Sequence, residues 1–183
     1  MASESRQKRW IVRPTALEDE EAINVLLKSS FETLLQPHYN GDVLKTALPL
    51  ITKTRKELLT CGTWYVAEDP ADRSIVGCGG WTPENPSKAK DGLPHLRHFA
   101  TDPKVTRQGV ARAIWGRIWQ DVRSKMGPCT SLEVFSTLTA KAFYESLGFV
   151  EVDTLELPLA DDCLFPCILM RRKGTTERGP NVS

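Results

Sequence analysis

One stretch in the middle of the sequence restricts the possible folds more than any other. It contains residues typical of a strand at 96–101, a sharp turn, a long amphipathic helix at 107–125 and a second buried strand at 132–135. The pair Gly127-Pro128 follows the helix in the order that usually ends one. Two strands joined by a helix form a right-handed crossover and lie parallel in one sheet. The stretch therefore predicts an α/β protein.

Further elements on both sides of this stretch extend the predicted sheet. Strands are expected at 10–12, 64–68, 75–81, 149–157 and 163–170. Helices are expected at 16–36, at 43–59 with a kink or break at Pro49, and at 139–147. The hairpins among these strands imply antiparallel neighbours for the parallel pair. Together they predict a mixed sheet of six to seven strands with helices on both faces.

The domain organisation follows from length and composition. A chain of 183 residues fits one domain, and no linker-like segment divides it. We expect a single domain at 1–172 and a flexible C-terminal tail at 173–183.

Charge and hydropathy narrow the classes of partner. The 24 basic and 23 acidic residues give a net charge of +1, which lacks the broad positive field that non-specific nucleic-acid binding requires. Apolar runs stay far below the roughly 20 residues that span a bilayer, and residues 1–9 do not resemble a signal peptide. We therefore expect no nucleic-acid or membrane partner and a cytoplasmic location, with the nucleus also open.

The cysteines are expected to be reduced and free of metal. There are five of them, an odd number, in a chain without a recognisable secretion signal. Cys163 and Cys167 are four residues apart on a predicted strand, which is too far along it for a usual metal pair.

The turn between the central strand and the long helix has the features of an anion-binding site. The first N–H groups of a helix lack an internal partner, and the helix dipole favours an anion beside them. Gly109 and Ala111 are small enough for a pyrophosphate to approach this backbone. A glycine here also suits any tight turn, and the glycine patterns of Rossmann and P-loop proteins are absent.

Three segments together resemble the GNAT N-acetyltransferases: His98 to Arg112, Leu132 to Val134 and Ala142 to Phe149. Their order and spacing agree with that family, and the close resemblance covers about half of the chain. It implies the GNAT fold, in which the sheet splays between the strands at 99–101 and 132–135. Thr106, where the family usually has Gln or Arg, and Thr139, where it often has Asn, depart from the pattern.

The resemblance also implies acetyl-CoA as cosubstrate and no metal. The pantetheine arm would lie in the splayed sheet against the backbone of Phe99, Ala100 and Thr101. The pyrophosphate would be held by the turn residues Arg107, Gln108, Gly109, Val110, Ala111 and Arg112.

Three residues match catalytic positions of the family. Tyr144 matches the proton donor to the departing thiolate, and its alternative is a core aromatic beside Phe143. His95 and Glu133 match positions at which different relatives place a general base. Their alternatives are an exposed histidine and a glutamate paired with an arginine.

The implied function is acetyl-CoA-dependent N-acetyl transfer to a primary amine by direct attack on the thioester. A non-catalytic acyl-CoA-binding or sensor module and a structural domain without a cofactor site are the alternatives. The sequence selects neither a small-molecule nor a protein amine as acceptor, and it leaves the oligomeric state open. The loops at 36–41 and 82–94 are expected to select the acceptor.

Overall fold

Seven strands form one open, mixed sheet in the computed structural model, which describes residues 10–84, 93–161 and 163–174. The strand order is β1-β2-β3-β4-β5-β7-β6, and only β4 and β5 are parallel. The strands are β1 (Ile11–Pro14), β2 (Trp64–Glu68), β3 (Ile75–Thr82), β4 (His95–Thr101), β5 (Leu132–Ser136), β6 (Val150–Ala160) and β7 (Cys163–Arg172). The predicted mixed sheet is confirmed. Most of the predicted tail and of the 82–94 loop lies outside the described residues.

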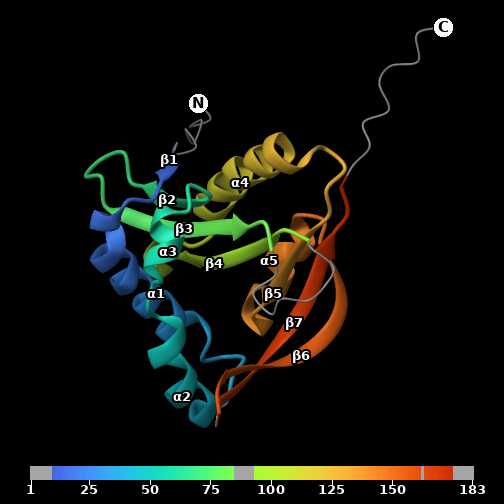
Figure 1. The fold of residues 1–183 in the computed structure, drawn as a ribbon. Helices are drawn as coiled ribbons and strands as arrows, with labels where there is room; N and C mark the ends of the chain where they lie inside the picture. The colour runs from blue at the N-terminus through green and yellow to red at the C-terminus, as the bar shows by residue number, and fades with distance from the viewer. Residues whose placement is uncertain (1–9, 85–92, 162, 175–183) are drawn as a thin grey trace, which may run out of the picture.

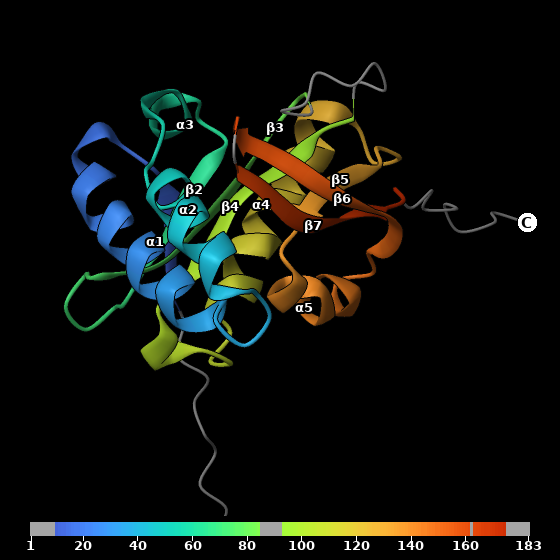
Figure 2. The ribbon, with the colours of Figure 1, turned by 90° about the horizontal axis from the view of Figure 1, so that it is seen from below.

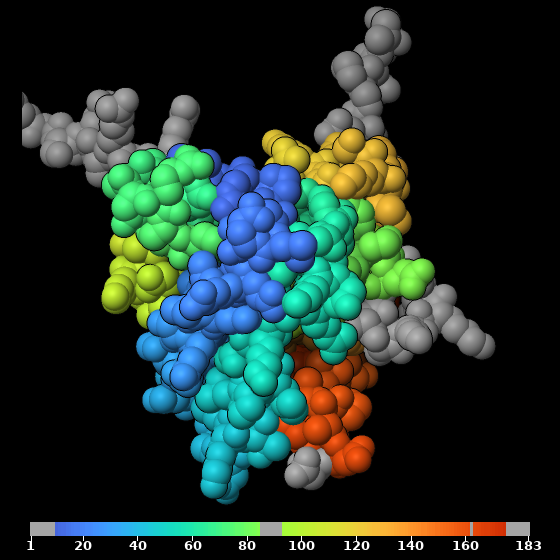
Figure 3. All heavy atoms as spheres, turned by 60° about the vertical axis from the view of Figure 1, so that its left-hand side comes forward, coloured from blue at the N-terminus to red at the C-terminus, as the bar shows by residue number. Residues whose placement is uncertain are grey.

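Helices cover both faces of the sheet (Figures 1 and 2). One face carries α1 (Glu20–Leu34), α2 (Gly41–Ile51) and α3 (Lys56–Thr60), which lie in front in Figure 3. The other face carries α4 (Val110–Met126) and α5 (Lys141–Ser146). Figure 1 also shows that β5, β6 and β7 run at a steep angle to β3 and β4. Among the described residues, no helix combines the length and the apolar character that a membrane span requires.

The helix predicted at 43–59 is two helices. Pro49 lies in the last turn of α2, which ends at Ile51, and α3 begins at Lys56. The backbone N–H of Thr54 in the connection donates to the side-chain oxygen of Asn24 at 2.8 Å, which ties the break to α1. Proline disturbs the turn before it, but α2 continues two residues past Pro49, so the break lies beyond the proline, between Ile51 and Lys56.

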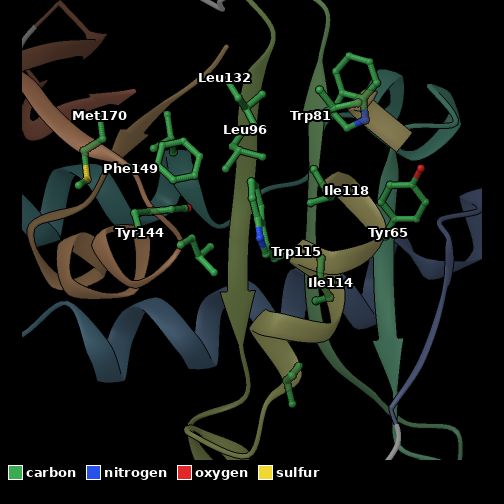
Figure 4. Close-up of a cluster of buried hydrophobic side chains, with 14 of the residues drawn as sticks. Tyr65, Trp81, Leu96, Ile114, Trp115, Ile118, Leu132, Tyr144, Phe149 and Met170 are labelled. Carbon is green, nitrogen blue, oxygen red and sulfur yellow. The ribbon is translucent and has the colours of Figure 1, made fainter. Parts of the chain in front are cut away.

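The largest core cluster lies between the sheet and α4 (Figure 4). Ile114 and Ile118 of α4 are fully buried against Leu96 of β4 and Leu132 of β5. Each such side chain contributes about 1.5–3 kcal/mol when it leaves water. Because Leu96 faces α4 and successive side chains of a strand alternate, its neighbours on β4 face the α1–α3 side.

Candidate active site

The sheet opens between β4 and β5. These strands share a single register pair, His95 with Glu133, and the backbone N–H of Glu133 donates to the carbonyl of Pro94 at 3.0 Å. Beyond this pair the β4 residues 99–101 have a partner strand only on the β3 side. The predicted splay is therefore present, and one edge of β4 faces the opening.

A β-bulge re-aims β4 beside this opening. Between the register pairs Gly80–Arg97 and Cys78–Ala100, one residue of β3 faces two residues of β4. His98 takes up the extra length with a φ of +44°, which is uncommon for a residue with a side chain. The bulge breaks the alternation of the strand and leaves His98 against Trp64, with their ring centroids 6.2 Å apart, on the α1–α3 side.

Phe99 follows the bulge and lies on the other side of β4. A Cβ added to Gly79 would be 2.7 Å from the Phe99 ring, so only glycine fits beneath it. The Phe99 ring contacts Phe143 and Tyr144 at centroid distances of 5.7 and 6.4 Å. The pantetheine-binding strand predicted from the sequence is thus in contact with the helix that carries the predicted proton donor.

One side chain within the turn after β4 and one from the N-terminal part of the chain bond its backbone. The Thr106 hydroxyl donates to the carbonyl of Pro103 at 3.2 Å. The indole N–H of Trp10 donates to the carbonyl of Gln108 at 2.9 Å. Thr106, the departure from the family pattern, therefore acts within the turn.

The start of α4 presents backbone N–H groups that no side chain caps. Gly109 is the N-cap residue with a φ of +88°, and Arg107 has a φ of +62°. The amides of residues 110–112 precede the first intrahelical bond, which Ala113 donates to the Gly109 carbonyl at 2.9 Å. The side chains of Arg107 and Arg112 are exposed beside them. These donors and charges fit a pyrophosphate group.

Gly77 of β3 determines how closely α4 approaches the sheet. A Cβ on this glycine would be 2.4 Å from Cγ1 of Val110, the first residue of α4. The helix start therefore lies directly over β3 and next to the C-terminal end of β4.

Tyr144 on α5 is buried, with 4% of its surface exposed. Figure 4 shows its hydroxyl end pointing toward β4. The Tyr144 ring also meets the ring of Phe149 edge-on at 5.5 Å. Burial raises the pKa of the phenol, so the side chain is a neutral, protonated group.

His95 lies between the two strands where they part. It is 1% exposed, and its Nε2 accepts a hydrogen bond from the backbone N–H of Phe135 at 3.1 Å. A regular parallel ladder would bring that N–H to the carbonyl of Leu96. The imidazole therefore takes the place of the next ladder bond. Burial, and to a lesser extent the charge of Arg97, lowers the pKa of His95 to about 3.

Glu133 is buried on β5 and paired across the sheet. Its carboxylate accepts hydrogen bonds from Nε and Nη2 of Arg171 on β7, at 2.9 and 2.6 Å. The ion-paired alternative considered for this residue is thus what the structure contains. Its register partner His95 places it beside the opening.

The α1–α2 connection packs against β7 and against the residues that follow β5. The Tyr39 hydroxyl donates to the carbonyl of Pro166 and accepts from the N–H of Leu138, both at 2.9 Å. Its ring stacks on Phe165 with centroids 4.7 Å apart. Thr139, the second departure from the family pattern, donates its hydroxyl to the carbonyl at the end of α1. The sequence pattern gave no indication of these contacts.

Two basic side chains on the α1–α3 side were also not singled out from the sequence. Arg97 follows Leu96 on β4 and is half-buried, and Arg55 is the exposed N-cap residue of α3. The alternation of the strand pattern was the signal that Arg97 faces away from α4.

The remaining side chains with metal or redox chemistry form no further site in the described part of the chain. All five cysteines are free. No group of three or more potential metal ligands occurs among the described residues.

Comparison with known proteins agrees with this geometry. The profile of the acetyltransferase (GNAT) domain matches residues 60–151. No curated protein sequence matches the chain.

Solved structures of low sequence identity share the fold. A GCN5-related N-acetyltransferase from Rhodopseudomonas palustris has 16% identity and a TM-score of 0.72, covering 91% of this chain and 97% of its own. The PaiA N-acetyltransferase from Thermoplasma acidophilum, solved in complex with coenzyme A, has 14% identity and a TM-score of 0.66, covering 90% and 99%. A spermidine N-acetyltransferase chimera from Vibrio cholerae and human sequences has 19% identity and a TM-score of 0.58, covering 90% and 95%. With the family profile matching about half of the chain, the protein belongs to the GNAT acetyltransferases.

Proposed function

We propose that this acetyltransferase uses acetyl-CoA to acetylate a primary amine by direct attack on the thioester. The observation that carries the proposal is the course of β4. β4 separates from β5 after a single residue pair and continues through a short turn into the start of α4, whose backbone N–H groups no side chain caps.

Acetyl-CoA would lie along β4 in one direction only. The pyrophosphate would meet the amides of residues 110–112 and the side chains of Arg107 and Arg112, and each charge-assisted bond contributes about 1.5–3 kcal/mol. The pantetheine arm would then run back along the free edge of Phe99, Ala100 and Thr101. Its thioester end would lie toward the start of β4. The coenzyme A complex of the Thermoplasma relative supports this proposal.

The reaction requires two proton movements. The neutral amine attacks the thioester carbonyl, a C–N bond forms, the C–S bond breaks, and the electron pair leaves on sulfur. The amine loses a proton and the thiolate gains one. Tyr144 is the proposed donor to sulfur, because it is protonated and its hydroxyl end points toward β4.

Glu133 is the proposed base. His95 suits this role less well, because its basic nitrogen already accepts the Phe135 N–H and burial disfavours its protonated form. Glu133 lies at the same point of the opening and carries a carboxylate. Its carboxylate oxygen would accept the proton that the attacking nitrogen loses as the C–N bond forms.

Thiol release tests the proposal directly. Purified protein is mixed with acetyl-CoA and a panel of small amines and N-terminal peptides, and free CoA thiol is measured against a no-amine control. We expect amine-dependent release. CoA binding by calorimetry without release from any amine would favour the non-catalytic acyl-CoA-binding module, which the hydrogen-bonded Nε2 of His95 also favours. Absence of CoA binding would contradict both functions.

A further inference from the structure

We propose that the acceptor is a small amine bearing a carboxylate, and that Arg97 and Arg55 bind this carboxylate at the mouth of the opening. The inference rests on the proposed acetyl transfer and adds the class of substrate.

Arg97 lies two residues beyond His95, where the β4–β5 pairing ends, and directly before the bulge at His98. Its side chain leaves β4 on the face opposite Leu96, the α1–α3 side. The indole N–H of Trp64 donates to the Arg97 carbonyl at 3.3 Å and holds this part of the strand in place. Arg97 is thus close to where the proposed thioester would lie.

Arg97 and Arg55 lack a counter-charge in the described part of the chain. No carboxylate of the described residues forms an ion pair with Arg97 or Arg55. Burial, and then the charge of Arg55, lowers the pKa of Arg97. A half-buried arginine beside a like charge is unfavourable unless an anion joins it.

His95 carries a buried N–H donor that has no hydrogen-bond partner among the described residues. Nε2 of His95 accepts a hydrogen bond, so the neutral ring carries its proton on Nδ1. That Nδ1 is buried and has no hydrogen-bond partner among the described residues. The α1–α3 side of β4 therefore carries a buried N–H donor and a half-buried cation without a matching acceptor among the described residues. A carboxylate supplies acceptor oxygens and negative charge together.

The same charges select against cationic acceptors. A positive field disfavours a second ammonium group on the substrate, and it also favours the neutral form of the attacking amine. An aminocarboxylate is therefore preferred over a diamine of equal length. The CoA phosphates are not the anion that Arg97 and Arg55 would bind, since the proposed pyrophosphate site follows the opposite end of β4.

Three amines of equal chain length test the proposal. They are 4-aminobutanoate, butylamine and 1,4-diaminobutane, compared by kcat/KM from thiol release at low salt, with glycine and β-alanine as shorter carboxylates. We expect the best aminocarboxylate to exceed butylamine by about tenfold or more, and diaminobutane to be the poorest. In Arg97→Gln the ratio of kcat/KM for the carboxylate to kcat/KM for butylamine, measured within the variant, should fall to about one. Lys56→Gln, which removes an exposed charge next to Arg55, should retain the preference.

A binding measurement separates this inference from the proposed function. The product N-acetyl-4-aminobutanoate and its uncharged analogue N-butylacetamide are titrated into the CoA-bound protein and into Arg97→Gln, after melting curves confirm that the variant is folded. Carboxylate-dependent binding that is lost in Arg97→Gln supports the site even if no amine is turned over. Equal turnover of all amines, a preference for the diamine, or a carboxylate preference unchanged in Arg97→Gln would overturn the inference while leaving acetyl transfer intact.

Discussion

The two ends of β4 are positioned by contacts of very different range. At its C-terminal end, the turn and the start of α4 follow within ten residues; Thr106 and Gly109 shape them locally, and Trp10 and Gly77 add one long-range contact each. At its N-terminal end, His95 contacts a residue 40 positions away, and its register partner Glu133 pairs with a residue 38 positions away. In the α1–α2 connection, Tyr39 bonds Leu138 and Pro166, which are 99 and 127 positions away in the sequence.

This difference separates two functions on one strand. The end proposed for the cosubstrate is built mainly by its local sequence and otherwise needs β3 and Trp10. The end proposed for the acceptor needs β5, β7 and the α1–α2 connection in place. Changes far from β4 in the sequence are therefore expected to alter acceptor use while leaving acetyl-CoA binding nearly unchanged. The following predictions test this separation.

Tyr144→Phe should have the largest effect. It removes the proposed proton donor, and general acid catalysis is typically worth about 100-fold or more in kcat. The dissociation constant of CoA should stay within about twofold, because the ring and its aromatic contacts remain. Steady-state kinetics and calorimetry measure the two quantities. Equal losses in both would instead indicate a packing role for Tyr144.

His95→Leu should lower the free energy of unfolding by about 2 kcal/mol, because it leaves the buried N–H of Phe135 without an acceptor. His95→Gln restores an acceptor oxygen and should recover much of the stability and most of the activity. Urea unfolding and thiol release measure both. If His95→Gln were folded but inactive, His95 would be the base, and its proposed role in separating the strands would be wrong.

Acid should destabilise the protein through its buried histidines. Burial lowers the pKa of His95 to about 3 and that of His98 to about 4, whereas the unfolded chain titrates near 6.5. Their stabilising contribution is fully present above pH 6.5 and is lost as the pH falls toward 4, because only the unfolded state then binds these protons. His95→Leu should reduce this slope by about 1.4 kcal/mol per pH unit, measured by urea unfolding between pH 7.5 and 4.5. An unchanged slope would contradict the assignment.

Gly109→Val should weaken CoA binding by about tenfold, because a left-handed conformation costs a residue with a side chain about 1–2 kcal/mol. Acceptor KM should not change at saturating acetyl-CoA. Gly116→Ala on the same helix is the matched control, since a Cβ there meets open space, and it should stabilise the protein slightly. Calorimetry with CoA gives the comparison. Normal affinity in Gly109→Val would remove the helix start from the proposed site.

Tyr39→Phe should have the smallest effect, about 1 kcal/mol of stability, because the stacking on Phe165 survives and only the hydroxyl bonds are lost. The acceptor KM should rise while CoA affinity stays the same. A change in CoA affinity alone would show that the two ends of β4 are not separate.

The same difference in range explains which features the sequence predicted. The strand at 64–68 has the predicted bounds, and the helix expected at 107–125 is α4. Both follow from side-chain periodicity within the segment. The helix predicted at 43–59, with a kink or break at Pro49, is split, but the break lies after Pro49, between Ile51 and Lys56.

The bulge and the role of His95 in the sheet were beyond sequence reasoning. The bulge exists only in the pairing of β4 with β3, and the His95 bond only in the position of β5. Arg97 was overlooked because its significance depends on α3 lying near it. The placement of Tyr144 beside Phe99 matches the family pattern, and its role as proton donor stays a prediction.

The single residue pair between β4 and β5 also has a mechanical consequence. Hydrogen bonding across the sheet is nearly interrupted there, so β1–β4 and β5–β7 form two half-sheets that are joined by the side chains packed beneath α4 and, on the other face, by the contacts of Tyr39 and α2 with β7. Native-state amide exchange is expected to resolve two cooperative units instead of one. Opening at this joint would admit a long, thin substrate without unfolding either half.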